Sequence, residues 1–383
     1  MEKFEPGTFG YDLQFLTRHD SDLIVLKNED GNAQVALSAK YQGKVFTSTA
    51  QGLQGKSLGW INYRAFDNIV AGAHINATGG EDRMWIGPEG GQFSLFFKPG
   101  ADMVYDNWFT PPAYDIEPWE LTSADKNTVR FRKKMSLSNF SGTHFDLTLE
   151  RRVTLLGQEQ TAALLELPPV DVNSVAFETV NTIVNTGSKP WEKATGTVCI
   201  WMLDMLTCGD GVTIITPYRA GDEKDLGKIA TTDYFGTIPP EWLRITDKAL
   251  FLKADGKKRA KTGLSPARAL PVSGCYDETN KILTIIKYSV HPEAEYINQL
   301  WEIQEQPFAG DAVNAYNDGP LDDGSQMGPF LEIESSSPAA LLAPAASMTH
   351  DHTVFHFTGS ESELSKISEK VLHLTIEEIK AVF

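Results

Sequence analysis

The chain has 383 residues, 41% hydrophobic and 22% charged, with 51 acidic against 34 basic side chains and a net charge of −17. This composition is globular, which excludes intrinsic disorder, and no run of about 18 apolar residues suggests a membrane span. The negative charge argues against nucleic acid as a partner, because it repels a phosphate backbone.

The first residues, Met1 to Pro6, show neither the basic nor the apolar segment of a secretory signal. As the sequence stands, we expect a cytoplasmic protein. If a signal peptide has been removed, we expect a periplasmic one.

The dominant sequence period is two. In the segment 144–149, Phe145, Leu147 and Leu149 alternate with polar residues, which predicts a half-buried antiparallel strand. The other predicted strands are 22–26, 33–39, 44–49, 92–97, 128–132, 176–184, 196–203, 211–216, 248–253, 281–290, 297–304, 328–334 and 353–358.

Long loops are predicted at 99–120, 217–241, 254–274 and 305–327. On a strand-rich scaffold, such loops are where binding usually occurs. Because the chain has no internal repeat and no Pro/Ser linker, we expect an all-β fold with one large antiparallel domain over 1–383.

A glycine-rich segment, Gly79–Gln92, holds Arg83 and Trp85 among five glycines. Arginine offers a planar fork of donors and tryptophan a flat apolar face. Together they suit a sugar ring, which has hydroxyl groups and apolar C–H faces. The alternative is a structural turn in which Arg83 pairs with Glu81 or Glu89.

Several weaker signals have structural explanations. The basic run Lys257–Lys261 is expected to be a solvated loop. The segment Asn317–Gly324 lacks the spacing of an EF-hand and is better explained by two consecutive turns. His74 and His291 are isolated histidines, but both border loops of interest.

The segment Gly328–Pro338 contains two glutamates on one strand face. Glu332 and Glu334 alternate with Leu331 and Ile333. Carboxylates ~7 Å apart repel each other, which can raise one pKa and provide a general base near neutral pH. The alternative is a solvent-facing acidic strand.

Three histidines, His350, His352 and His356, have even spacing and would share one strand face. Such spacing is compatible with a metal ion, but no carboxylate ligand can be identified from the sequence. We therefore expect a partly exposed strand face, with neither a metal nor a cofactor.

The chain is expected to end in two short helices. Ser360 with Glu363, and Thr375 with Glu378, have the spacing of capping boxes. Apolar residues at helical spacing follow each pair, so a helical tail is predicted over about 360–383.

Two segments resemble the galactose mutarotases (aldose 1-epimerases). Gly328–Glu334, followed by Leu342–Pro344 and Thr349–Phe357, resembles the family's C-terminal end, and Gly80–Leu95 resembles its Asn-Arg-Ile segment with a Gly-x-Phe hairpin. The closest likeness is to uncharacterised bacterial members. The detailed match covers about a tenth of the chain, and the strand-rich layout agrees over the rest.

The resemblance implies a β-supersandwich with a sugar site on a concave sheet face. In this family a glutamate takes the proton from the anomeric hydroxyl while a histidine protonates the ring oxygen. By position Glu332 matches the base, with Glu334 as the neighbouring alternative, and Arg83 matches the substrate-binding arginine. The candidate substrate-binding residues are Arg83, Trp85, Glu81, Asn317 and Asp318.

One departure affects the expected activity. The family's acid histidine follows an Asn-Thr-Gly-like turn, but here the turn Asn185–Pro190 precedes a strand Cys199–Leu203 without histidine. Loss of a general acid typically costs a factor of about 10²–10⁴ in rate. Either His74 or His291 replaces it, or the protein binds sugar without epimerising it.

Two functional hypotheses follow. The first is an aldose 1-epimerase acting on a free sugar, and the second is a non-catalytic carbohydrate-binding protein. Glycan hydrolysis or lyase chemistry on a longer chain is a less favoured third class. In each case the expected partner is a mono- or oligosaccharide.

Overall fold

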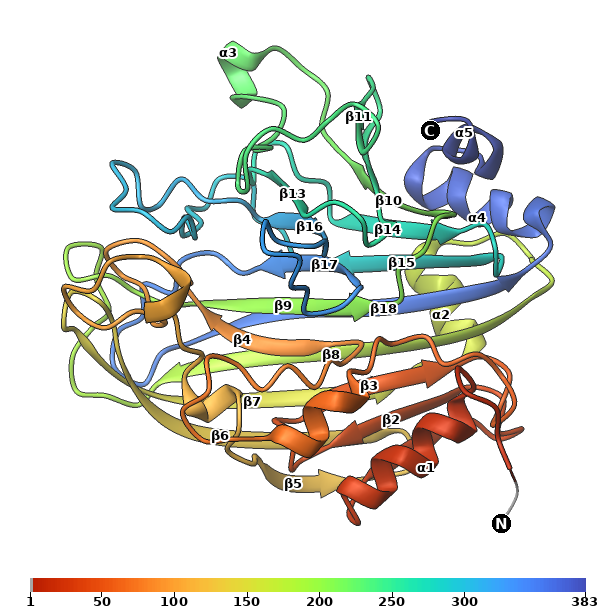
Figure 1. Cartoon of the computed structure of the whole chain (residues 1–383), viewed down its shortest axis with the longest axis horizontal. Coiled ribbons are helices and arrows are strands. Elements are labelled where there is room, and N and C mark those ends of the chain that lie inside the picture. Colours follow the sequence, from red (N-terminus) through yellow and green to blue (C-terminus); the bar gives the residue numbers. More distant parts are fainter. Residues whose placement is uncertain (1–2) are drawn as a thin grey trace.

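A computed structural model describes residues 3–383, and antiparallel β-sheets dominate it (Figure 1). The largest sheet has ten strands, in the order β11 (Leu243–Ile245), β12 (Ala249–Lys253), β10 (Val212–Pro217), β14 (Val272–Asp277), β15 (Ile282–Tyr288), β18 (Ser347–Gly359), β8 (Val172–Asn185), β7 (His144–Leu155), β6 (Thr128–Ser138) and β5 (Glu120–Ala124).

Two smaller sheets complete the β-structure. Five strands run in the order β13 (Ala260–Leu264), β16 (Val313–Asn317), β17 (Leu331–Ser336), β9 (Cys199–Leu206) and β4 (Arg83–Gly87), and three run in the order β1 (Ile24–Lys27), β2 (Gln34–Ser38) and β3 (Lys44–Thr49). The predicted β-supersandwich is therefore confirmed.

The main hydrophobic core joins the ten-stranded and five-stranded sheets. Leu331 and Ile333 of β17 belong to the same buried cluster as Phe177 of β8 and Val354 of β18. Burial of each such side chain contributes about 1.5–3 kcal/mol. This core holds β17 firmly between its neighbours.

The two predicted C-terminal helices are confirmed as α4 (Glu361–Leu372) and α5 (Ile376–Lys380). The Ser360 side chain accepts a hydrogen bond from the backbone of Glu363, and Thr375 forms a full capping box with Glu378. Leu364 packs in a second cluster on the ten-stranded sheet. Capping and burial of one apolar face together account for these helices.

Other helices were not predicted. They are α1 (Phe9–His19), α2 (Gln158–Leu165), the single turn α3 (Glu223–Leu226), and the 3₁₀ helices η1 (Tyr63–Asn68), η2 (Tyr105–Asn107) and η3 (Pro112–Tyr114). Helix α1 lies against the three-stranded sheet, where Phe9 and Leu16 pack on Phe46 (Figure 1). Among the described residues, no helix is long and apolar enough to cross a membrane.

The predicted strand boundaries are wrong in places. The segments 92–97 and 297–304 are irregular, whereas β13 and β16 form inside predicted loops and β4 inside the glycine-rich segment. A short apolar run does not by itself distinguish a strand from a buried loop. In β4, pairing with β9 overrides the low strand propensity of the surrounding glycines.

Candidate functional site

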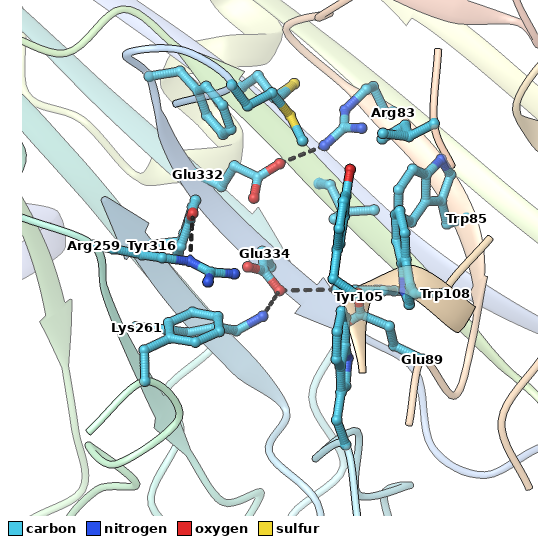
Figure 2. A pocket seen from close by; sticks show the side chains of 18 residues that line it. Arg83, Trp85, Glu89, Tyr105, Trp108, Arg259, Lys261, Tyr316, Glu332 and Glu334 are labelled. Atoms are coloured by element: carbon cyan, nitrogen blue, oxygen red, sulfur yellow. Dashed lines mark hydrogen bonds and ion pairs between the residues drawn. The ribbon is translucent and has the colours of Figure 1, made fainter. Parts of the chain in front are cut away.

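A pocket of about 680 Å³, including its open mouth, lies on one face of the five-stranded sheet. Figure 2 shows the side chains that line it: Ile75, Arg83, Trp85, Glu89, Tyr105, Trp108, Trp201, Leu203, Met205, Phe235, Arg259, Lys261, Trp301, Tyr316, Met327, Phe330, Glu332 and Glu334.

The strand register brings the charged groups together. Glu332 stands opposite Tyr316 of β16 and Met205 of β9, and Glu334 stands opposite Leu203. Because alternate residues of a strand share a face, both glutamates line the pocket as predicted from the sequence.

Arg83 and Glu332 form a buried ion pair in which the guanidinium Nη2 donates to Glu332 Oε1 (Figure 2). Burial raises the pKa of Glu332 to about 8, although Arg83 opposes the rise and the nearby Glu334 adds to it. The carboxyl can therefore change its protonation state near neutral pH.

Glu334 has different partners. Its Oε2 accepts hydrogen bonds from Lys261 Nζ at 2.8 Å and from Trp201 Nε1 at 2.9 Å. Burial would lower the pKa of Lys261, but the carboxylates of Glu334 and Glu89 outweigh it and the pKa is raised. The pocket thus contains a second ion pair, between Lys261 and Glu334. The Trp201 indole donates to the same carboxylate oxygen as Lys261.

Arg259 forms a third polar group at the wall. Its guanidinium carbon lies 3.8 Å from the ring centre of Phe235, and its Nε donates to Tyr316 Oη at 3.3 Å. The Tyr316 hydroxyl donates to Asp318 Oδ1 at 3.0 Å. Burial raises the pKa of Tyr316, so its hydroxyl stays a neutral donor.

Aromatic rings form the opposite wall. Trp85 packs edge-on against Trp201, and Trp108 stacks on Trp301 with their ring centres 5.9 Å apart. Tyr105, just over half exposed, stacks on Trp108 nearer the surface. Flat apolar faces beside convergent charged groups suit a ligand with C–H faces and hydroxyls.

Glu89 supplies a third carboxyl group. It follows β4 after a short turn, and its backbone N–H donates to Gln299 Oε1 at 3.1 Å. Burial raises the pKa of Glu89, with Lys261 opposing the rise. The pocket therefore combines three carboxyl groups with three cationic side chains.

Four of the predicted site residues, Arg83, Trp85, Glu332 and Glu334, meet in this pocket. Arg83 pairs with Glu332, and not with Glu81 or Glu89 as the turn interpretation supposed. Glu81 lies instead between the sheets, where its Oε1 accepts from Ser48 Oγ at 2.7 Å.

The remaining predicted residues do not line the pocket. His74 stacks between Tyr105 and Phe109, with its Nδ1 2.6 Å from the carbonyl oxygen of Trp108. The backbone N–H of His291 donates to Tyr296 Oη at 3.0 Å. Neither histidine is among the lining side chains.

Asn317 and Asp318 brace the neighbouring loops. Asn317 is fully buried and binds the backbone N–H of Gly256 at 3.0 Å. Asp318 accepts from the backbone N–H of Gly328 at 2.8 Å and from Tyr316. Asp318 thus reaches the pocket indirectly, by holding Tyr316.

The expectation of a partly exposed histidine face is wrong. His350, His352 and His356 are each no more than 2% exposed, because β18 lies in the interior of the ten-stranded sheet and the five-stranded sheet covers that face. Burial lowers the pKa of His350 to about 3, which keeps its ring neutral.

Sequence reasoning missed Arg259 and Lys261, which were assigned to a solvated basic run. The available signal was alternation, because two residues of spacing two share a strand face. In the structure Lys257 is exposed and pairs with Asp210 at the surface, whereas Lys261 points into the pocket.

A family model matches residues 7–383. The chain belongs to DUF6786, a family of unknown function. Comparison of this DUF6786 sequence with curated proteins gives no match.

Solved structures share its fold. An Escherichia coli protein provisionally assigned as an aldose 1-epimerase superposes with a TM-score of 0.52 at 12% identity, over 87% of this chain and 98% of that one. The Slr1438 protein from Synechocystis sp. PCC 6803 gives 0.51 at 14% identity, over 88% and 96%. The DUF6786 chain therefore has the galactose mutarotase-like fold.

Proposed function

We propose that this DUF6786 protein binds a free mono- or oligosaccharide in the pocket and interconverts its anomers, with Glu332 as the general base. The observation that carries the proposal is the buried Glu332 carboxyl, held by Arg83 in a pocket with an aromatic wall. A titratable group with a strongly shifted pKa in a cleft supports a functional site.

The proposed reaction needs two proton transfers. Glu332 removes the proton from the anomeric hydroxyl, and an acid protonates the ring oxygen as the bond from C1 to that oxygen breaks. The open-chain aldehyde rotates about its C1–C2 bond, and reversal of both transfers closes the ring to the other anomer. Arg83 holds one oxygen of Glu332, which orients the carboxyl for the transfer.

Glu89 is the side chain that best supports the acid role. Burial raises its pKa, which favours the protonated form that an acid needs. The family resemblance suggested His74 or His291 as the general acid, and a general acid has to reach the substrate. Those histidines are not among the side chains that line the pocket.

A non-catalytic sugar-binding protein is the second candidate. It is favoured by a specific observation, namely that one oxygen of each glutamate on β17 is already held, by Arg83 and by Lys261. In that case the charged groups would bind sugar hydroxyls and the aromatic wall would bind the C–H faces, with no proton transfer.

Magnetisation exchange between α- and β-anomers, measured by NMR over a panel of free aldoses, tests the enzymatic proposal. We expect the wild type to accelerate exchange of at least one aldose and Glu332→Gln to lower that rate at least about 100-fold. Glu159→Gln, an exposed glutamate on α2, is the matched control and should leave the rate unchanged. Wild-type activity in Glu332→Gln would contradict the assignment.

Calorimetry with the same sugars separates the two candidates. Binding without exchange would establish the non-catalytic one, and no binding of any saccharide would remove both. Tyr105→Ala should weaken binding about tenfold, since Tyr105 lines the pocket. Phe109→Ala should not, because Phe109 stacks on the other side of His74 without lining the pocket.

A further inference from the structure

A second polar cluster lies between the sheets, on the face of the five-stranded sheet that is turned away from the pocket. It consists of Asp82, directly before β4, Asp204 of β9 and His352 of β18, all of them fully buried. One oxygen of each aspartate and one ring nitrogen of His352 lie within 4.8 Å of one another. Three segments distant in sequence therefore converge on one point.

Each carboxylate in this region has one oxygen with a partner and one oxygen without. Asp82 Oδ1 accepts from Arg151, and Asp204 Oδ2 lies 2.7 Å from His352 Nε2. Among residues 3–383, nothing hydrogen-bonds to Asp82 Oδ2, Asp204 Oδ1 or Glu81 Oε2, and all three atoms are buried. A carboxylate oxygen only accepts, so the missing partner has to be a donor or a cation.

The formal charges point to a cation. Glu81, Asp82 and Asp204 carry three negative charges, and the Arg151 guanidinium supplies one positive charge. His356 also belongs to this cluster, because its Nε2 lies 3.0 Å from Glu81 Oε1. With neutral imidazoles at His352 and His356, two negative charges are left over in a water-excluded region. One divalent cation makes the cluster neutral, which is how buried charges are usually accommodated.

We propose that Asp82, Asp204 and His352 bind one divalent first-row metal ion, Mn²⁺ or Zn²⁺. A mixed set of carboxylate and imidazole ligands suits these ions better than an all-oxygen set, which suits Ca²⁺ and Mg²⁺. Ligand atoms about 2.0–2.2 Å from one ion lie at most about 4.4 Å apart, and the three groups, with ligand atoms within 4.8 Å of one another, are close to that spacing.

The imidazole is already oriented for this role. His352 Nδ1 lies 2.9 Å from Ser335 Oγ, which in turn lies 2.8 Å from His350 Nε2. In the metal-bound form Nδ1–H donates to Ser335 Oγ, and the deprotonated Nε2 presents its lone pair to the ion. Metal binding replaces the hydrogen bond between Nε2 and Asp204, and any proton on Nε2 leaves to solvent. A hydrogen-bonded second ring nitrogen is the usual support of a histidine ligand.

The ion would connect the two large sheets directly beneath the pocket. Asp82 precedes Arg83, and Asp204 lies between Leu203 and Met205. Arg83, Leu203 and Met205 line the pocket on the other face of the sheet. The expected role is structural, because the site lies on the opposite face from Glu332. A test of the metal site is therefore independent of whether the pocket binds sugar.

Metal stoichiometry of the full chain tests the proposal. The protein is stripped with EDTA, incubated with MnCl₂ or ZnCl₂, desalted, and analysed by elemental mass spectrometry. We expect about one ion per chain, and pulsed EPR of the Mn²⁺ form should show coupling to one imidazole nitrogen. Less than about a tenth of an equivalent of both metals, or bound Mn²⁺ without nitrogen coupling, would overturn the proposal.

Variants locate the site. Asp204→Asn and His352→Gln should each retain less than about a tenth of the wild-type metal. The exposed neighbour Asp351→Asn and the pocket variant Glu332→Gln should retain one equivalent. Full retention by Asp204→Asn or by His352→Gln would overturn the assignment. If neither variant folds, the EPR measurement on the wild type decides alone.

Discussion

Two glutamates on the same strand face, two residues apart, illustrate how local contacts separate chemically identical groups. Glu332 is held by the guanidinium of Arg83, and Glu334 by the ammonium of Lys261 and an indole N–H. The sequence predicted the shared face, because strand alternation is a local property. The choice of Glu332 as the base came from the family resemblance and is still a prediction. It did not predict the partners, since these come from strands that are distant in sequence.

The raised pKa of Glu332 predicts how activity depends on pH. A base must be deprotonated to accept a proton, and burial raises this pKa to about 8. We therefore expect kcat/KM for anomer exchange to increase from about pH 6 to about pH 9, with its midpoint near that value. An NMR exchange profile checks this. A profile that is flat or falls over this range would argue against Glu332 as the base.

Comparison of Lys261 with Lys257 tests how burial of an ion pair affects the free energy of unfolding. Lys261 makes a buried ion pair with Glu334, whereas Lys257 pairs with Asp210 in solvent. Lys261→Met should lower the free energy of unfolding by about 3 kcal/mol, because it leaves a buried carboxylate without its cation. Lys257→Met should leave the free energy of unfolding nearly unchanged, because the exposed ion pair is screened by solvent. Urea denaturation measures both, and equal effects would contradict the structural distinction.

Among the secondary-structure elements, those with strong local signals were predicted and those fixed by long-range pairing were not. Helices α4 and α5 were predicted from their capping residues, which are a local sequence signal. Strand β4 lies among glycines and forms because it pairs with β9, more than 110 positions away along the chain. Helix α1 was missed although Thr8 caps it, because its apolar face becomes evident only against the three-stranded sheet.

Helix α4 offers a test at this level. Leu364 is fully buried against the ten-stranded sheet, whereas Leu321 is 45% exposed in a loop. Leu364→Ala should destabilise the protein by about 2–5 kcal/mol through lost burial and the cavity that is left. Leu321→Ala should change stability by less than about 0.5 kcal/mol. Thermal or urea unfolding compares them, and a small effect at Leu364 would mean that the tail is not part of the cooperative unit.

For the whole molecule, the composition indicated a globular protein and the sequence period of two indicated many strands. The resemblance in two segments indicated the fold. That the chain forms one domain over 1–383 is still a prediction. The buried polar layer between the sheets was beyond sequence reasoning, because burial of the β18 histidines depends on how one sheet covers another. Periodicity along a strand identifies a face but not what lies against it.

The net charge of −17 leads to a prediction for the molecule as a whole. Like charges destabilise the compact state, and salt screens them. Raising NaCl from about 10 mM to about 200 mM at pH 7.5 should therefore raise the melting temperature by about 2–4 °C. At pH 5, close to the isoelectric point of about 4.9, the same change should have little effect. A lower melting temperature at pH 7.5 in salt would contradict this view.

The step from Asp82 to Arg83 constrains how this family can change. Consecutive residues at the start of β4 face opposite sides of one sheet, with Arg83 in the pocket and Asp82 in the inter-sheet cluster. A one-residue insertion or deletion here would exchange the two environments, sending a guanidinium inward and a carboxylate outward. Descendants can therefore vary this segment by substitution but not by length, and a conserved spacing would be its evolutionary signature.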